Sequence, residues 1–175
     1  MRKVILYIAC SLDGYIARNN DAIDFLGGHT AEVVDYGYDA FLSTVDTLIL
    51  GSKTYLELIH HLAIDAWPYP SKTVYVFSKR LKGKNEEVSF VDGDVVTFVD
   101  QLKQQEGKDI WIVGGRGVIE PLLKSKRIDR FVITIMPILI GSGKPLFSIL
   151  DSDTQLKLVS NDTYNGMVML TYEKR

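Results

Sequence analysis

Three short peptides in this chain combine glycine or hydroxyl residues with a cation, and each follows a run of apolar residues. They are residues 51–54 (Gly-Ser-Lys-Thr), 78–80 (Ser-Lys-Arg) and 114–117 (Gly-Gly-Arg-Gly). Glycine lets a backbone approach a ligand closely, and the start of a helix presents free N–H groups and a positive dipole end. Hydroxyl groups and cations hold phosphate oxygens. The chemistry shared by the three peptides is therefore the binding of an anion.

Each peptide also has a simpler interpretation. The 114–117 peptide predicts a diphosphate cradle, and the alternative is a tight turn between a strand and a helix. Taken alone, the 51–54 peptide fits a helix cap with a solvated lysine. The 78–80 peptide fits either a charged loop that blocks edge pairing or a site for a phosphate monoester, such as the 2′-phosphate of NADP. Together the three favour one anion site, because all would lie at the same rim of a sheet.

An alternation of strands and helices positions these peptides. The predicted strands span 3–10, 46–51, 73–78, 88–91, 110–113 and 131–140, and the predicted helices span 30–44, a short segment from 52, 94–106 and 118–123. Residues 11–29 read as a long irregular loop, a feature that is usually functional. Residues 155–161 and 167–173 predict a hairpin around Asn165 and Gly166. The pattern favours an α/β fold with a mostly parallel sheet, where ligands bind beyond the carboxyl ends of the strands.

Length and composition limit the other possibilities. The 175 residues predict one domain, 1–175, and 46% hydrophobic with 24% charged residues is typical of a globular protein. A formal charge of -2 gives no general attraction to nucleic acid or to an anionic membrane. The one cysteine, Cys10, excludes an internal disulfide and a multi-cysteine zinc site. The apolar run 3–10 is too short to span a bilayer, so we expect the buried first strand of a cytoplasmic protein.

Several common motifs are missing from the sequence. No G-x-G-x-x-G follows the first strand, and neither a Walker A sequence nor a G-x-S-x-G elbow occurs. His60 and His61 are adjacent, and neighbouring side chains on a helix point in different directions. The sequence therefore predicts no metal site.

An ordered set of peptides across the whole chain carries a family resemblance. These peptides are residues 11–17, 35–38, 46–55, 67–69, 76–78, 112–115 and 137–147. With them the chain resembles the dihydrofolate reductase superfamily, and more closely the bacterial dihydrofolate-reductase-like proteins related to the reductase domain of riboflavin biosynthesis. The resemblance implies a three-layer α/β fold with a mostly parallel central sheet and an antiparallel C-terminal hairpin.

The resemblance also implies an NADPH-dependent reductase. Lys53 and Thr54 would hold phosphates, residues 78–79 would flank the adenosine end, and the 114–118 segment would cradle the diphosphate across a cis peptide bond. The residues predicted to bind the cofactor are Ala9, Leu12, Ile16, Gly51, Lys53, Thr54, Ser78, Lys79, Arg80, Val113, Gly114, Gly115, Arg116, Gly117 and Val118. Relatives commonly carry Arg at the position of Ser52, so here a 2′-phosphate would depend on nearby lysine and arginine side chains.

The predicted catalytic residue is Asp35. An ungapped match places it where folate reductases carry the carboxylate that holds the pterin and supports protonation, a role that suits a partly buried acid. The alternative is an acidic helix N-terminus, shared with Glu32 and Asp39. In the riboflavin reductases this carboxylate would only line the pocket.

The leading hypothesis is a reductase that transfers a hydride from NADPH to a C=N or C=O bond of a planar heterocycle, either dihydrofolate or a pterin- or pyrimidine-like compound. One alternative is a stand-alone 5-amino-6-(5-phosphoribosylamino)uracil reductase; with a single cysteine the chain has no deaminase half, which weakens the riboflavin assignment without excluding a stand-alone reductase. The other is a non-catalytic module that binds NADPH. The resemblance also implies a homodimer, which relatives commonly form through the sheet edge or the long loops; the terminal hairpin and the 67–69 loop are the candidate contributors here.

Overall fold

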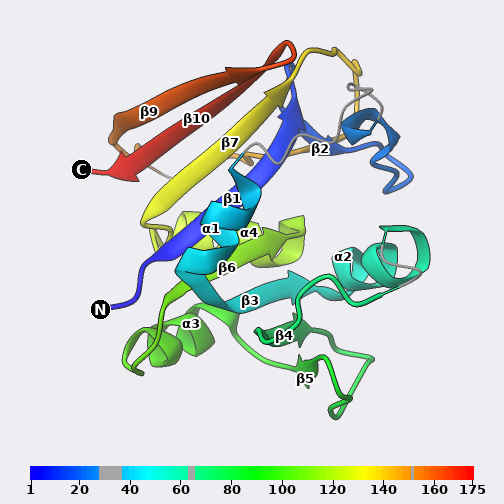
Figure 1. The fold of residues 1–175 in the computed structure, drawn as a ribbon, viewed down its shortest axis with the longest axis vertical. Helices are drawn as coiled ribbons and strands as arrows, with labels where there is room; N and C mark the ends of the chain where they lie inside the picture. The colour runs from blue at the N-terminus through cyan, green and yellow to red at the C-terminus, as the bar shows by residue number, and fades with distance from the viewer. Residues whose placement is uncertain (28–36, 63–65, 151) are drawn as a thin grey trace.

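A single large sheet runs through the molecule and carries helices on both faces (Figure 1). The computed structural model describes residues 1–27, 37–62, 66–150 and 152–175. The eight-stranded sheet has the order β5-β4-β3-β6-β1-β7-β10-β9. The strands from β5 to β7 pair in parallel, whereas β10 runs antiparallel to both β7 and β9. A mostly parallel sheet with an antiparallel edge is the fold class that the sequence predicts.

The strands are β1 (Val4–Ser11), β2 (Tyr15–Ala17), β3 (Val45–Gly51), β4 (Thr73–Phe77), β5 (Ser89–Val91), β6 (Asp109–Gly114), β7 (Arg130–Met136), β8 (Lys144–Pro145), β9 (Leu156–Tyr164) and β10 (Met167–Lys174). The helices are η1 (Asp24–Leu26), α1 (Tyr38–Thr44), α2 (Ser52–Glu57), the π-helical turn η2 (Leu58–Leu62), α3 (Val95–Lys103) and α4 (Arg116–Lys124). None of these described helices is long and apolar enough to cross a membrane.

Beyond shifts of one to three residues at the ends of elements, three segments differ from the sequence predictions. Strand β7 ends at Met136 instead of continuing to 140, because Pro137 has no N–H to donate to a neighbouring strand. The 11–29 segment is not wholly irregular, since it contains η1 and strand β2, which pairs with β8. Helix α1 begins only at Tyr38, because Gly37 before it has a φ of 77° in the left-handed region, so the predicted helix 30–44 is not continuous through residue 37.

The C-terminal hairpin confirms its prediction and is longer than expected. Asn165 and Gly166 connect β9 to β10 with φ angles of 46° and 83°. Two positive φ values match the type I′ turn that Asn-Gly favours, because its twist follows that of the paired strands.

The core lies in two apolar layers, one on each face of the sheet. Alternate residues of a strand point to opposite faces. In β1, Leu6 packs into the layer that contains Ile119 of α4, whereas Ile5 packs into the layer that contains Leu48 and Trp111. In Figure 1, α1 lies in front of the sheet and α4 behind it. This arrangement buries both faces of the central strands.

The amino ends of three central strands are held together by Arg2. Its guanidinium is buried, pairs with Asp46, and donates to Thr47 Oγ1 and to the carbonyl of Lys108, each at 2.5 Å. These contacts tie the start of β1 to the starts of β3 and β6. Charge-assisted hydrogen bonds of this kind are among the strongest in proteins.

Candidate functional site at the carboxyl ends of the strands

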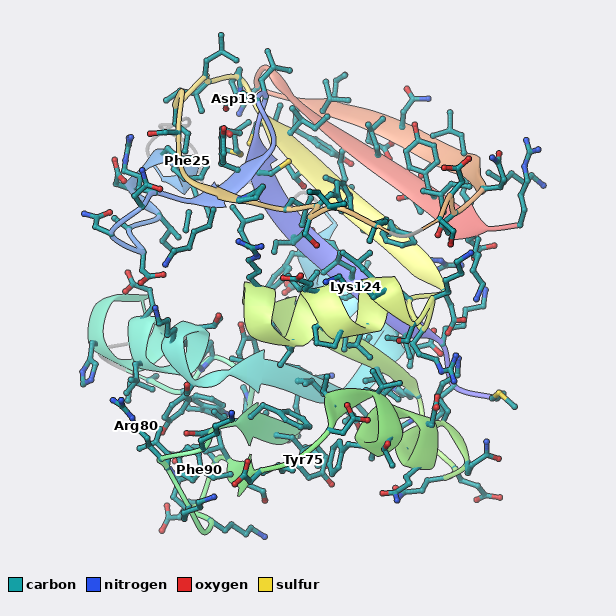
Figure 2. All side chains as sticks on the ribbon, turned by 180° about the vertical axis from the view of Figure 1, so that it is seen from behind. Asp13, Phe25, Tyr75, Arg80, Phe90 and Lys124 are labelled. Carbon is teal, nitrogen blue, oxygen red and sulfur yellow. The ribbon has the colours of Figure 1, made fainter. Side chains whose placement is uncertain are left out.

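The three anion-binding peptides predicted from the sequence lie at the ends of three adjacent strands. The 51–54 peptide ends β3, the 78–80 peptide follows β4, and the 114–117 peptide follows β6, in the sheet order β4-β3-β6. Neighbouring strands are about 4.8 Å apart, so the three peptides span roughly 10 Å. Figure 2 shows Asp13 and Arg80 toward the same edge of the molecule, with α2 between them.

The first and third peptides are in direct contact. The backbone of Leu50 is in register with Gly114, and a Cβ at Gly51 would lie 3.4 Å from the Gly115 nitrogen. A Cβ at Gly115 would lie only 2.9 Å from Thr54 Oγ1. The Gly114–Gly115 peptide bond is cis, as the resemblance implies. Glycine at 115 therefore leaves the room that the Thr54 hydroxyl occupies.

The start of α4 presents an open backbone. The Gly115 carbonyl accepts from Val118 N at 3.0 Å and from Ile119 N at 3.1 Å, so the amides of Arg116 and Gly117 precede the first intrahelical hydrogen bond. A Cβ at Gly117 would have no heavy atom within 4 Å. A ligand can thus approach these amides closely. The Val118 amide is used within the helix, and its side chain is buried in the core.

The pairing of β1 with its two neighbours ends at different places. Toward β6 the pairing ends at Leu6, whereas toward β7 it continues to Ser11. The carboxyl ends of β1 and β6 therefore diverge. Divergence of adjacent parallel strands creates the crevice in which α/β proteins usually bind ligands.

The peptide groups of β1 that face this divergence are those of Tyr7 and Ala9. The carbonyl of Lys3 accepts from Ile110 N of β6, and peptide groups alternate in direction along a strand, so residues 7 and 9 face the same way. The Tyr7 carbonyl accepts a hydrogen bond from Trp111 Nε1 at 3.0 Å. The Ala9 peptide lies one step further, at the open end of the divergence.

Asp13 fixes the turn that follows β1. Its carboxylate accepts from Ser11 Oγ at 2.5 Å and from Gly141 N at 2.7 Å. The Ser11 hydrogen bond is the main reason that the pKa of Asp13 is below its usual value. The turn places Ile16 in the core, whereas the Leu12 side chain is 62% exposed. Of the two apolar residues predicted here to line a ligand, Leu12 thus lies at the surface.

The 78–80 peptide forms a cationic turn beyond β4. The Ser78 side chain is buried, and its hydroxyl oxygen accepts from the backbone N–H groups of Arg80 at 3.2 Å and Leu81 at 2.9 Å. Lys79 and Arg80 are exposed. Ser78 therefore holds the turn, and the two cations face solvent.

Lys53 is the one cation of the 51–54 peptide, and it forms an ion pair. Its ammonium lies 3.0 Å from Asp21 Oδ2. The other carboxylate oxygen of Asp21 pairs with Lys144 of β8. The sequence interpretation did not assign these two partners a role.

An aromatic cluster lies under α1, beside the divergence of β1 and β6. Tyr7 stacks on Phe41 with ring centroids 4.3 Å apart, and Trp111 meets Phe41 edge to face at 5.2 Å. The Tyr38 hydroxyl donates to that of Tyr69, and burial raises the pKa of both groups. Sequence reasoning missed this cluster as part of the site, because its members come from four separate segments.

The predicted catalytic residue, Asp35, lies outside the described residues, as does Glu32. Helix α1 begins at Tyr38 after Gly37, so neither residue belongs to it, and Asp39 in its first turn is exposed. The role assigned to Asp35 therefore stays a prediction from the sequence.

Comparisons with known proteins identify the family of the chain. Residues 2–170 match the model of the RibD C-terminal domain. The chain is 40% identical over 172 residues to the uncharacterized protein YwjB of Bacillus subtilis (strain 168), covering 98% of this chain and 97% of that protein. It superimposes on a putative riboflavin biosynthesis protein from Shewanella sp. PV-4 with a TM-score of 0.86 and 32% identity, over 99% of each chain.

A more distant structural neighbour is dihydrofolate reductase from Enterococcus faecalis, whose structure was solved in complex with NADP(H) and RAB-propyl. Its TM-score is 0.69 at 16% identity, over 98% of this chain and 96% of that one, which is a likeness of fold. Together these matches confirm the family resemblance and the dihydrofolate-reductase-like fold. The chain belongs to the RibD C-terminal domain family.

Proposed function

From this family membership, we propose that the chain is an NADPH-dependent reductase that delivers a hydride to a C=N or C=O bond of a planar heterocycle. One observation carries the proposal. The three anion-binding peptides form a continuous row from the divergence of β1 and β6, across β3, to the cations beyond β4. A row of this kind suits an extended dinucleotide with phosphate groups along its length.

The residues present fit NADPH. The open amides of Arg116 and Gly117, together with the Thr54 hydroxyl, suit the diphosphate. Lys79 and Arg80 suit the 2′-phosphate, because both are exposed cations on a turn held by a buried hydroxyl. When bound, the cofactor would supply the hydride, and the protein would supply position and surroundings.

The other residues of the site would hold and shield the reacting rings. The Ala9 peptide faces the divergence and offers both a donor and an acceptor to a ring substituent. The turn held by Asp13 borders the same opening. On the α1 side, Tyr7 and Phe41 provide an apolar wall against which a flat ring can stack. Asp35 stays the proposed source of the proton.

A second candidate is the reduction of 5-amino-6-(5-phosphoribosylamino)uracil in riboflavin biosynthesis. The match to the RibD C-terminal domain favours it over dihydrofolate, and the Shewanella protein at 32% identity is named for the same pathway. A pyrimidine reductase and a folate reductase would share the row of phosphate-binding peptides. They would differ in the residues that contact the substrate ring beside Tyr7 and Phe41.

The testing experiment is a titration of tryptophan fluorescence with NADPH and, separately, with NADH. Trp111 is buried three residues before Gly114, so energy transfer to a bound nicotinamide will quench it. We expect NADPH to bind more tightly than NADH. Replacing Lys79 and Arg80 together by methionine should remove that preference. Lys157→Met on β9, an exposed residue away from the strand ends, is the matched control for loss of charge.

Turnover then separates the substrates. Oxidation of NADPH is followed by the loss of its nicotinamide absorbance, first with dihydrofolate and then with 5-amino-6-(5-phosphoribosylamino)uracil. The compound that causes NADPH oxidation identifies the substrate class. Tight binding without oxidation by either would favour a non-catalytic module. If neither nucleotide binds, the proposal fails and the 114–117 peptide is an ordinary turn.

A further inference from the structure

The carboxylate of Asp21 forms ion pairs with lysines from two separate segments near the carboxyl ends of the strands. Asp21 lies in the loop between β2 and η1, and Lys53 is the second residue of α2. Figure 1 shows this loop and α2 at the same edge of the molecule. Lys144 of β8 pairs with the same carboxylate. One anion is thus shared by two ammonium groups from separate segments.

We propose that Asp21 competes with the cofactor phosphate for Lys53, and so limits the affinity of the site for anionic nucleotides. The inference rests on the proposed function, because Lys53 is the cation predicted to hold a phosphate beside Thr54. In the structure, the ammonium of Lys53 has a carboxylate as its partner at 3.0 Å. A phosphate oxygen would offer the same ammonium an equivalent charge-assisted hydrogen bond.

The exchange of partners leaves no buried charge behind. The Lys53 side chain is 77% exposed, so its ammonium can reorient in solvent at small cost. Asp21 keeps Lys144, whose side chain is 28% exposed, when Lys53 turns to a ligand. The Asp21 carboxylate then stays near the bound phosphate as a like charge. Even in a medium with the dielectric constant of water, two unit charges about 6 Å apart repel by enough to weaken binding about threefold.

The backbone hydrogen bonds of the loop around Asp21 do not involve its carboxylate. Arg18 N donates to the carbonyl of Ala22 at 2.8 Å, and Asp21 N donates to the carbonyl of Arg18 at 3.1 Å. Asp21 has a φ of 71°, in the left-handed region where asparagine and glycine are also favoured. Asp21→Asn therefore removes the charge and keeps the backbone, and Asp21→Gly provides a second variant with the same property.

The test measures the dissociation constants of NADPH and NADH at low and at high salt. We expect Asp21→Asn to bind NADPH at least about threefold more tightly than the wild type at low salt, with a smaller gain at high salt. Asp21→Gly should change affinity in the same direction. The matched control is Asp24→Asn, which removes one charge from the same loop. Asp24 pairs with Arg18 at 2.6 Å instead of with Lys53, so its replacement should leave affinity within about twofold.

The outcomes separate the two proposals. A gain for both nucleotides supports competition at the diphosphate, and a gain for NADPH alone supports competition at the 2′-phosphate. If the wild type binds NADPH and Asp21→Asn binds it equally or more weakly, competition is refuted and the proposed function stands. If neither the wild type nor any variant binds a nucleotide, the proposed function fails first.

Discussion

Replacement of Gly117 by alanine should move stability and cofactor affinity in opposite directions. Gly117 is the second residue of α4, its φ is not in the left-handed region, and it is exposed. A Cβ there would meet no heavy atom within 4 Å. Alanine loses less backbone freedom than glycine when a helix forms. The free energy of unfolding should therefore rise by about 0.5 kcal/mol, a smaller gain than in a helix interior.

Affinity for NADPH should fall in the same variant. If the diphosphate lies against the amides of Arg116 and Gly117, the added methyl group occupies the space that the ligand needs. Loss of one close backbone contact should weaken binding about tenfold, or about 1.4 kcal/mol. The protein itself would be more stable, so the loss could not be attributed to misfolding.

The assay pairs thermal unfolding with the fluorescence titration. An increase of about 0.5 kcal/mol corresponds to roughly 1–2 °C in the melting temperature of a domain of this size. Gly115→Ala is a useful contrast, because its Cβ would lie 2.9 Å from Thr54 Oγ1 and should destabilise the fold. If Gly117→Ala melts higher and binds NADPH as tightly as the wild type, the ligand does not approach the start of α4.

Three other changes have definite expected outcomes. Trp111→Phe removes the indole donor to the Tyr7 carbonyl and should lower the free energy of unfolding by about 2 kcal/mol in urea titrations. Ser78→Ala removes the buried acceptor of two backbone N–H groups. It should lower the free energy of unfolding by about 1 kcal/mol and reduce the ratio of NADPH affinity to NADH affinity. Hydrogen bonds from Lys3 and Arg130 lower the pKa of Glu173 from 4.5 to about 2. The stabilisation of the folded state by this carboxylate is therefore fully present above pH 4.5 and is lost as the pH falls toward 2. Glu173→Gln should flatten the stability profile across that pH interval, and an unchanged profile would contradict this assignment.

The parts of the site that are formed by contiguous residues could be predicted from the sequence. Glycine and hydroxyl residues directly after a buried strand mark a strand-to-helix turn, and such turns meet at one rim of a parallel sheet. The structure places Gly51, Ser78 and Gly114 at the ends of three adjacent strands, in agreement with that reasoning. The hairpin at Asn165 was predictable for a similar reason, since two residues determine its turn.

The parts that depend on contacts between distant segments could not be predicted. The divergence of β1 and β6 follows from where two sets of pairing end, at Leu6 on one side and Ser11 on the other. The contact between Asp21 and Lys144 needs the β2–β8 pairing, which is too short to leave a periodic pattern. The end of β7 was misplaced because the apolar run continues past Pro137. The homodimer and the role of Asp35 stay predictions.

The short pairing between β1 and β6 makes the sheet resemble two panels joined along a seam. One panel holds β1, β7, β10 and β9, and the other holds β6, β3, β4 and β5. The seam is closed by three residue pairs and by the buried Arg2 at one end, and it is open at the other. If NADPH binds in the open end as proposed, it would contact both panels and hold them together there. Binding should then slow amide hydrogen exchange in both panels, including strands that do not contact the ligand.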